Sequence, residues 1–340
     1  MCGIWSILNK DPNSVWNGYS EALEAGKPRG PEQTETCSTN QALHVFHRLA
    51  INGLDDDSMM PLDIDDCILI CNGEIYNYKE LCELLNVTPK TKNDCEIIIH
   101  LYRKVGIQRC AEMLDGEFAF VLQDRRLGDG TEPDKMFFVR DPYGVRPLFL
   151  LTDDTTQLIS VASELKVLHN LVPGGNIAQV SPGTVTTVEK SWRVNSRWQI
   201  TGTQRYHNIL ITPSTFGQLD PNTCEVVSYM RSIVDTFIDA VRKRVTNTDR
   251  PVACLLSGGL DSSLVAAIAS KIYPGKLKTY GIGFSGSEDL IMARMVSQHI
   301  GSDHESIVVT EEEFLEAIPE VVRTIESYDT TSVRASVGNY

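Results

Sequence analysis

The pattern of apolar residues changes near residue 224, and this change limits what the chain can fold into more than any other feature. Before it, short β-type runs predominate, namely CGIWSIL (2–8), ALHVFHRLAI (42–51), CILICNG (67–73), FAFVLQD (118–124), KMFFVRD (135–141), LISVAS (158–163) and GTVTTVE (183–189). After it, helical and strand-like segments alternate. Since 340 residues suffice for two cores, we expect a domain over 1–190, a linker with some strand over 191–223, and a second domain over 224–340.

Two helical stretches interrupt the strands of the first half. They are YKELCELLN (78–86) and CEIIIHLYRKVG (95–106), and each has apolar residues three and four positions apart. Strands in runs with few helices between them are typical of α+β domains, in which sheets pack face to face and helices lie outside. We therefore expect an α+β fold for residues 1–190.

The second half begins with a long amphipathic helix over 225–245, whose last turns carry basic residues that complement the helix dipole. Strands and helices then alternate: a buried strand VACLL (252–256), a helix from Leu260, a strand KTYGIGF (278–284), a helix over 289–301, and a strand ESIVVT (305–310). Thr310 and Glu313 form a capping box for one further helix. This alternation indicates a parallel, doubly wound α/β sheet.

The composition disfavours several kinds of partner. A net charge of −14 argues against nucleic acid, because phosphate binding requires clustered Lys and Arg. No apolar run reaches the ~18 residues that span a bilayer, and no signal peptide is evident, so we expect a cytoplasmic protein without membrane contact. Nine cysteines without CxxC spacing indicate reduced thiols, and neither they nor the histidines form a metal-binding motif.

A cysteine stands directly behind the initiator methionine in MCGIW (1–5). On one interpretation, Cys2 is a small apolar residue in the first turn of an edge strand. On the other, Met1 is removed and Cys2 carries a free α-amine, whose pKa of about 7.7–8.0 lets it take the thiol proton through one water. That is how an N-terminal nucleophile works, and the pentapeptide alone leaves both interpretations open.

The segment SGGLDSS (257–263) lies between a predicted strand and its helix. Two glycines let the backbone pass close to a ligand with its N–H groups exposed, and the start of the helix adds positive partial charge. The serines supply further donors, and Asp261 suits a Mg²⁺ ion beside pyrophosphate. A plain glycine-rich turn between a strand and a helix, with serines as helix caps, would have the same sequence pattern. The lack of GK[ST] excludes a Walker loop.

SGGxDS after a strand resembles the pyrophosphate loop of ATP pyrophosphatases, and the N-terminal half resembles class II glutamine amidotransferases. In this order, the two are similar to the family of glutamine-hydrolysing asparagine synthetases. The segments that carry the resemblance run through nearly the whole chain: MCGIW, RGPE (29–32), FHRLAI (46–51), CNGEIYN (71–77), NDCEI (93–97), MLDGEFAFVL (113–122), RDPYGVRPLF (140–149), SGGLDSS, YGIGFSGSEDL (280–290) and ESYDTTSVRAS (326–336).

The resemblance implies an αββα N-terminal-nucleophile domain followed by an α/β domain of the ATP-pyrophosphatase type. It also implies a carbon–nitrogen ligase that uses glutamine, L-aspartate, and ATP with Mg²⁺. Ammonia released from glutamine would pass through an internal tunnel to a β-aspartyl-AMP, giving asparagine, AMP, pyrophosphate and glutamate. A homodimer is one assembly that the sequence leaves open.

For the glutaminase, the resemblance makes Cys2 the nucleophile and makes Asn72 and Gly73 the oxyanion donors. Arg48 would bind the α-carboxylate of glutamine, because its planar guanidinium can donate two parallel hydrogen bonds to a carboxylate and a lysine cannot. Asp94 and Glu74 would bind the α-ammonium group. The stretch after Arg48 would complete the pocket: Leu49, Ala50, Ile51 and Asn52.

Several of these assignments have plainer alternatives. Asn-Gly at 72–73 is a strong hairpin signal, Arg48 would otherwise be a surface cation, and Asp94 would otherwise be the N-cap of the helix at 95–106. Glu32 stands where the family commonly has aspartate, which leaves its contacts open.

In the second domain, the resemblance assigns the ATP phosphates to Ser257, Gly258, Gly259, Asp261 and Ser262, with Asp261 acting through Mg²⁺. Leu256 and Ile282 would contact adenine and ribose, although both fit equally well as plain sheet core.

A doubly wound sheet binds its ligand at the switch point between its first and fourth strands. Only three strands are evident before Tyr340, and the SGEGSDE segment and later lysine of the family are not seen. We therefore weigh an asparagine synthetase, represented here by the first half of its synthetase domain, against a glutaminase-only enzyme or an interaction subunit. A phosphoribosyl or sugar-phosphate amidotransferase would not explain SGGLDSS, and Cys2 argues against β-lactam synthetase relatives.

Overall fold

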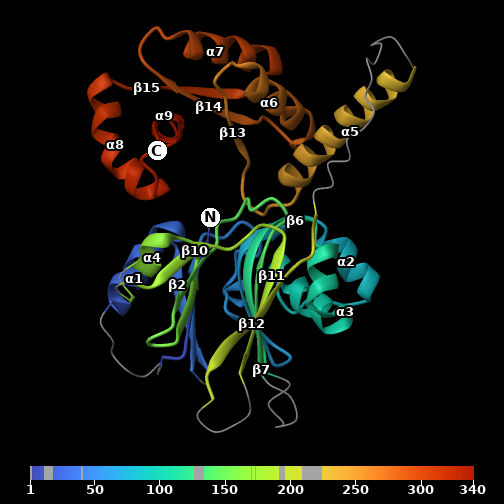
Figure 1. Cartoon of the computed structure of the whole chain (residues 1–340). Helices are drawn as coiled ribbons and strands as arrows, with labels where there is room; N and C mark the ends of the chain where they lie inside the picture. Colours follow the sequence, from blue (N-terminus) through green and yellow to red (C-terminus); the bar gives the residue numbers. More distant parts are fainter. Residues whose placement is uncertain are drawn as a thin grey trace. The chain divides into compact units, whose positions relative to one another are not determined.

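The computed structural model describes residues 2–10, 18–39, 41–125, 134–169, 171–172, 174–190, 196–208 and 224–340. The chain divides into two compact units, Met1–Leu210 and Ile211–Tyr340, each described here by itself (Figure 1). Of the segment expected as a linker, residues 191–195 and 209–223 lie outside the described ranges. Within those ranges, no helix combines the length and the apolar content needed to cross a membrane.

Two six-stranded antiparallel sheets form the centre of the first unit. The first sheet has the order β10-β8-β9-β1-β3-β2 and consists of β1 (Gly3–Leu8), β2 (Gln33–Thr39), β3 (Ala42–Arg48), β8 (Phe149–Asp153), β9 (Leu158–Ala162) and β10 (Asn176–Gln179). The second has the order β12-β11-β7-β6-β5-β4 and consists of β4 (Leu62–Ile64), β5 (Cys67–Ile75), β6 (Gly116–Asp124), β7 (Asp134–Arg140), β11 (Thr184–Lys190) and β12 (Trp198–Arg205). Each strand predicted before residue 190 is confirmed.

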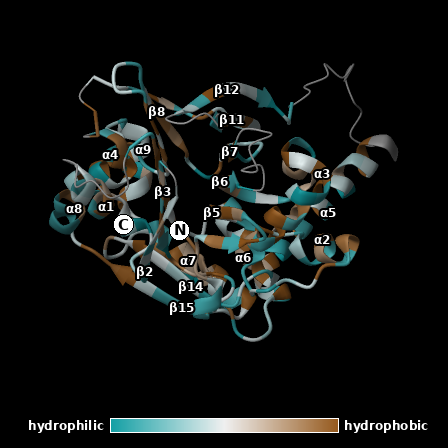
Figure 2. Ribbon diagram, turned by 90° about the horizontal axis from the view of Figure 1, so that it is seen from below, coloured by the Kyte–Doolittle hydropathy of each residue, from teal (hydrophilic) through white to brown (hydrophobic). Residues whose placement is uncertain are grey.

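Helices cover both sheets of this unit. They are α1 (Tyr19–Gly26) and α4 (Leu165–His169) on the first sheet, and α2 (Tyr78–Leu85) and α3 (Ile97–Met113) on the second. Short 3₁₀ turns lie at η1 (Lys27–Arg29), η2 (Asp56–Ser58) and η3 (Asp94–Glu96). In Figure 2, α2 carries both teal and brown residues, as an amphipathic helix on a sheet does.

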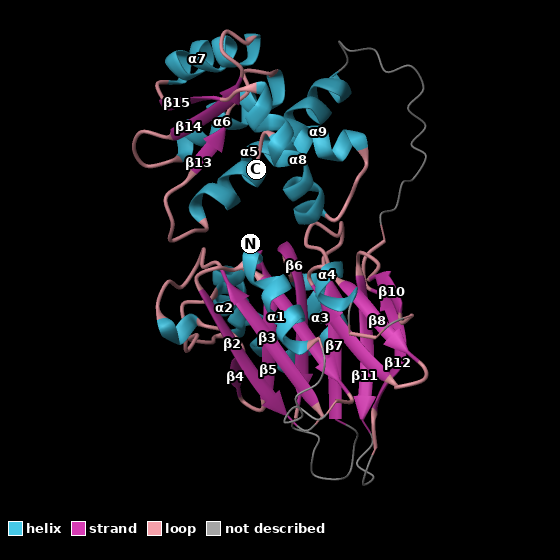
Figure 3. Ribbon diagram, turned by 90° about the vertical axis from the view of Figure 1, so that its left-hand side faces the viewer, coloured by secondary structure: helices cyan, strands magenta, loops and turns pink. Residues whose placement is uncertain are grey.

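The alternation of side chains along β1 divides its residues between two cores. Ile4 and Leu8 join the cluster that contains residues of both sheets, whereas Trp5 and Ile7 pack in a second cluster with residues of α1 and α4. The unit therefore has the layers helix, sheet, sheet, helix (Figure 3). This confirms the αββα architecture expected for the first domain.

The second unit is a parallel three-stranded sheet of order β13-β14-β15, flanked by helices. Its elements are α5 (Cys224–Thr246), β13 (Ala253–Leu255), α6 (Leu260–Ile272), β14 (Lys278–Gly283), α7 (Glu288–Ile300), β15 (Asp303–Val308), α8 (Glu311–Ile325) and α9 (Thr330–Val337). The predicted capping box at α8 is present, since Thr310 Oγ1 accepts from Glu313 N (3.2 Å) and Glu313 Oε2 accepts from Thr310 N (2.8 Å). The parallel α/β class is confirmed.

One detail of this unit differs from the prediction, because β13 is not a buried strand. Ala253 is exposed, and the Leu255 side chain is 66% exposed. Among the described residues, β13 pairs with β14 alone, so that its other edge has no strand beside it. The apolar run predicted burial, but the described elements do not supply a neighbour that would cover it.

Candidate active site

One cavity in the first unit brings together every residue predicted for the glutaminase. Its lining includes Cys2, Arg48, Leu49, Ala50, Ile51, Asn52, Asn72, Gly73, Glu74 and Asp94. They come from the residue before β1, the end of β3 and the loop after it, the end of β5, and η3. The sequence did not single out the remaining lining residues, which are Phe46, Ser58, Met60, Cys71, Asn93, Cys95 and Arg146.

Cys2 is fixed in this cavity through its backbone and its thiol. Its carbonyl oxygen accepts from Arg29 Nε (2.9 Å) and from Asn72 Nδ2 (3.1 Å), with the Asn72 amide oriented so that its oxygen faces Arg29 Nη2 (3.3 Å). Its Sγ lies 3.4 Å from both the nitrogen and the oxygen of Leu49. Burial raises the pKa of the Cys2 thiol, and the contact with Leu49 opposes this in part. The thiol therefore requires a base before it can attack.

Asn72 and Gly73 lie inside β5 and not in a hairpin turn, so the turn alternative is wrong. An asparagine side chain has two N–H donors, and one of those on Asn72 is used by the Cys2 carbonyl. The second is left for a ligand. A Cβ atom on Gly73 would lie 2.4 Å from Glu117 O on the neighbouring strand, so that no larger residue fits there.

Arg48 is buried, with 6% of its surface exposed, and it is not a surface cation. Its Nη2 donates to Gly53 O (2.5 Å) and Asp55 O (2.8 Å), which closes the loop after β3 around the guanidinium. Glu32 supports the same loop, since its Oε2 accepts from Ala50 N (2.9 Å). The glutamate at position 32 thus reaches the pocket wall.

Asp94 is also buried, and its Oδ2 accepts from Ile75 N (2.6 Å). Burial raises the pKa of this carboxyl, and the negative charge of Glu74 adds to the effect, so that the pKa is about 6. The N-cap alternative for Asp94 is wrong, because the cap of η3 is Asn93, whose Oδ1 accepts from Cys95 N (2.9 Å). A buried carboxylate that lines a cavity suits an ammonium group.

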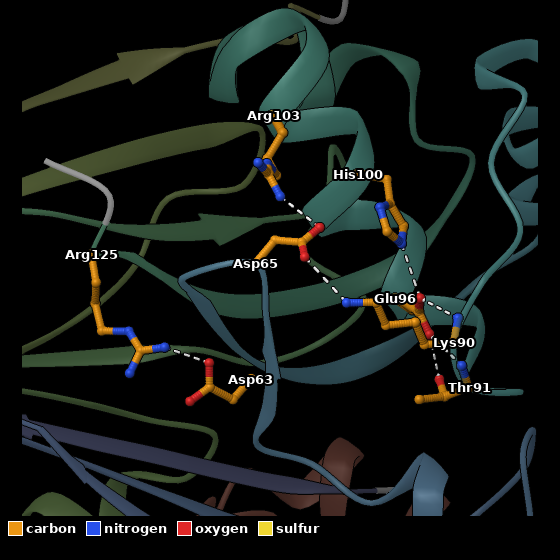
Figure 4. A network of polar contacts seen from close by, with 8 residues as sticks. All are labelled: Asp63, Asp65, Lys90, Thr91, Glu96, His100, Arg103 and Arg125. Carbon is orange, nitrogen blue, oxygen red and sulfur yellow. Dashed lines mark hydrogen bonds and ion pairs between the residues drawn. The ribbon is translucent and has the colours of Figure 1, made fainter.

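Glu96 ties the loop that precedes this site to α3 (Figure 4). Its buried carboxylate accepts from Lys90 N and Thr91 N (2.7 Å each), from Thr91 Oγ1 (2.7 Å) and from His100 Nε2 (2.9 Å). Burial alone raises the pKa of Glu96, but the bonds from His100, Lys90 and Thr91 outweigh it and lower the pKa to about 2. The ionised carboxylate therefore holds the loop in place.

The turn between β4 and β5 joins the same network (Figure 4). Asp65 pairs with Lys90 (3.1 Å) and with Arg103 of α3 (2.5 Å), and Asp63 pairs with Arg125. These pairs are partly exposed, and each contributes little to stability. Through Asp65, the turn links Lys90 of the loop before the site to Arg103 of α3, whereas the Asp63–Arg125 pair lies apart from this network.

Arg146 is the charged residue of the pocket that sequence reasoning missed. It lies in RDPYGVRPLF, which carried the family resemblance but was assigned no role. Its Nη2 donates to Glu74 Oε1 (3.2 Å) and lies 3.7 Å from Glu117 Oε2. A short arginine-containing turn between two strands was the signal that could have drawn attention to it.

In the second unit, SGGLDSS joins the end of β13 to α6. Gly258 has a φ of 81°, and a Cβ on it would lie 2.5 Å from Ala293 N, so that only glycine fits without strain. Ser257 Oγ contacts Ser262 Oγ (3.0 Å) and accepts from Gly259 N (3.3 Å). Gly259, the residue before α6, supplies no side-chain cap, which leaves the first N–H groups of the helix available to an anion.

The remaining residues predicted for the ATP site are Leu256 and Asp261, which adjoin or belong to this loop in the chain, and Ile282 in the neighbouring strand β14. Asp261 is exposed in the first turn of α6, and Leu256 is buried in a cluster with Ala266 and Ala293. Ile282 is half-buried in β14. In the part of the chain that the structure describes, no group of three His, Cys, Asp or Glu side chains is placed to hold a metal ion. One carboxylate beside bound phosphates still fits Mg²⁺, which usually keeps several waters.

Residues 1–191 match the family described as glutamine amidotransferase domain. The chain therefore belongs to the glutamine amidotransferase family. Residues 232–340 match the family described as asparagine synthase. The whole chain is 38% identical to the asparagine synthetases (glutamine-hydrolyzing) of Gallus gallus and Homo sapiens, and 37% identical to that of Bos taurus.

The chain spans 62% of the length of each of these relatives. Among solved structures, the glutamine phosphoribosylpyrophosphate amidotransferase from B. subtilis, in complex with ADP and GMP, has a TM-score of 0.49 at 14% identity, with 91% of each chain covered. That similarity is too small to support a further conclusion.

Proposed function

We propose that the first unit hydrolyses the side-chain amide of glutamine, with Cys2 as the nucleophile. The observation that carries the proposal is the convergence of Cys2, Arg48, Asn72 and Asp94 on one cavity from four separate segments. A cation and a buried carboxylate in one pocket match the two charged groups of an amino acid. The membership in the glutamine amidotransferase family supports the same substrate.

The chemistry follows from the surroundings of Cys2. Removal of Met1 frees an α-amine, which takes the proton of the buried thiol, and the thiolate attacks the amide carbon. The second N–H of Asn72 and the backbone N–H of Gly73 stabilise the negative oxygen that develops. The α-ammonium of Cys2 returns its proton to the amide nitrogen, the tetrahedral intermediate expels ammonia and leaves a thioester, and water hydrolyses the thioester to release glutamate and restore the thiol.

Arg48 and the buried carboxylates orient the substrate in this scheme. Arg48 holds the α-carboxylate of glutamine, while Asp94 and Glu74 receive the α-ammonium group. Leu49, Ala50, Ile51 and Asn52 line the space between them. The bonds from Arg48 to the loop after β3 favour a pocket that is formed before glutamine binds.

We propose further that the second unit serves asparagine synthesis, as its similarity to the asparagine synthase family suggests. The SGGLDSS loop would hold the phosphates of ATP through backbone N–H groups and the hydroxyls of Ser257 and Ser262, with Asp261 bound to Mg²⁺. Ile282 would contact the nucleoside. The enclosed side chain of Leu256 limits its contact to the backbone.

In this scheme residues 1–190 form the glutaminase domain and residues 224–340 the ATP-binding portion of the synthetase domain. Ammonia from Cys2 would convert an activated aspartate to asparagine. We propose that the protein acts in the cytoplasm and that it forms a homodimer.

A glutaminase without synthetase activity is the second candidate for the 340-residue chain. The exposed β13, which has one strand neighbour among the described residues, favours it, because adenylation requires a site enclosed from water. The test is to incubate the chain with glutamine, aspartate, ATP and Mg²⁺, and to follow glutamate, pyrophosphate and asparagine separately. Glutamate without pyrophosphate would support the second candidate. Asparagine and pyrophosphate in equal amounts would refute the second candidate, and no glutamate would refute the glutaminase.

A further inference from the structure

Two carboxylates face each other across β5 and β6 beside the glutamine pocket. Glu74 and Glu117 are paired in the register of these strands, and like charges placed opposite each other destabilise a sheet. Asp94, a third carboxylate, lies close enough for the charge of Glu74 to act on it. This wall of the pocket therefore requires a cation.

Arg146 supplies that cation. Its side chain is 7% exposed, its Nη2 donates to Glu74 Oε1 (3.2 Å), and the same nitrogen lies 3.7 Å from Glu117 Oε2. The charge thus lies between the paired carboxylates and is little screened by water.

The turn that carries Arg146 is built to hold it in place. Asp141 is buried, and its carboxylate accepts from the backbone nitrogens of Tyr143 (3.0 Å), Val145 (3.0 Å) and Arg146 (2.9 Å). From the other side, the buried Arg140 donates to Arg146 O (2.8 Å) and to Gly144 O (2.8 Å). These five hydrogen bonds hold the turn in one conformation and so fix where the Arg146 side chain begins.

We infer that Arg146 is a positioning residue for glutamine: by bridging Glu74 and Glu117, it offsets their negative charge beside Asp94, so that Glu74 and Asp94 together receive the α-ammonium group. This inference rests on the proposed glutaminase. The charged and titratable side chains that face the pocket are Cys2, Arg48, Cys71, Glu74, Asp94, Cys95 and Arg146, with Glu117 opposite Glu74 on β6. Removal of one positive charge from this set favours protonation of the carboxylates at a higher pH.

The experiment measures KM for glutamine between pH 5 and pH 8.5, from glutamate release by the full chain. In the parent, KM rises at low pH as Asp94 becomes protonated. In Arg146→Gln, the midpoint of this rise moves upward by about one pH unit, the size expected for loss of a nearby opposite charge. In Glu117→Gln it moves downward, because Arg146 then acts on fewer negative charges. The double variant Arg146→Gln with Glu117→Gln returns towards the parental midpoint.

Two further variants separate charge from structure. Arg146→Lys keeps the charge and holds the midpoint near that of the parent, while Arg125→Gln, at a partly exposed pair with Asp63, leaves the whole profile unchanged. An unchanged midpoint in Arg146→Gln, or in Glu117→Gln if the former does not fold, overturns the inference. A parent without glutamate release refutes the glutaminase itself, and the two failures are therefore distinguishable.

Discussion

Replacement of Glu96 by glutamine tests whether an ionised, buried carboxylate supports the pocket. In Glu96→Gln, the amide oxygen can accept fewer bonds, and the amide nitrogen meets the backbone donors of Lys90 and Thr91. A pKa lowered from 4.5 to about 2 corresponds to about 3 kcal/mol of stability at neutral pH, at 1.36 kcal/mol for each pH unit. We expect a loss of this order in the free energy of unfolding.

The sign of the pH dependence follows from the lowered pKa. The stabilisation by Glu96 is fully present above about pH 4.5 and is lost as the pH falls towards 2, because the folded state must then take up the proton. The difference between the parent and Glu96→Gln should therefore be largest at pH 7 and fall to about half by pH 3.

Urea unfolding followed by tryptophan fluorescence measures this difference in the first unit alone, since all four tryptophans lie within the first 198 residues. Glu112→Gln is the matched control, because its pair with Arg109 is exposed on α3. A difference below about 0.5 kcal/mol at pH 7, comparable with that of a surface substitution, would show that the network does not stabilise the loop.

Three other substitutions test the site. Cys2→Ala should abolish glutamate release while the urea midpoint stays near that of the parent; residual hydrolysis at the parental rate would mean a different nucleophile. Asp94→Asn should raise KM for glutamine roughly 10- to 100-fold at pH 7.5, as for a lost buried charge-assisted bond, and should remove the change in KM near pH 6; a KM that still varied there would assign the titration to another group. Gly73→Ala should destabilise the first unit by about 2–4 kcal/mol, because its Cβ would lie 2.4 Å from Glu117 O; parental stability in urea would contradict this close approach.

The sequence predicted the strands whose own residues form an apolar run. It did not predict features that depend on which strand lies alongside. β1, β5 and β6 have apolar runs that fit any packed sheet. β2, in contrast, is the polar and largely exposed QTETCST, which is a strand because it pairs with β3. β13 shows the reverse case, since its run predicted burial but its neighbours do not cover it.

The same distinction applies to the candidate site. Cys2, Arg48 and Asp94 belong to segments with a strong family resemblance, and their meeting in one cavity agrees with that resemblance. The turn that carries Arg146 is visible in the sequence, but the contact of Arg146 with Glu74 could not be predicted, because it depends on the register that places Glu74 opposite Glu117. Pairing across strands is a property of the fold and leaves no local pattern in the sequence.

The central claim is that Cys2, freed of Met1, is the nucleophile of a glutamine site. The most direct measurement is the mass of the chain and of its N-terminal peptide after incubation with a glutamine analogue that carries an electrophilic carbon in place of the amide. The account predicts one adduct, on Cys2, in chains that lack Met1, and protection by excess glutamine. An adduct on Cys71 or Cys95, or on Cys2 in chains that retain Met1, would contradict it.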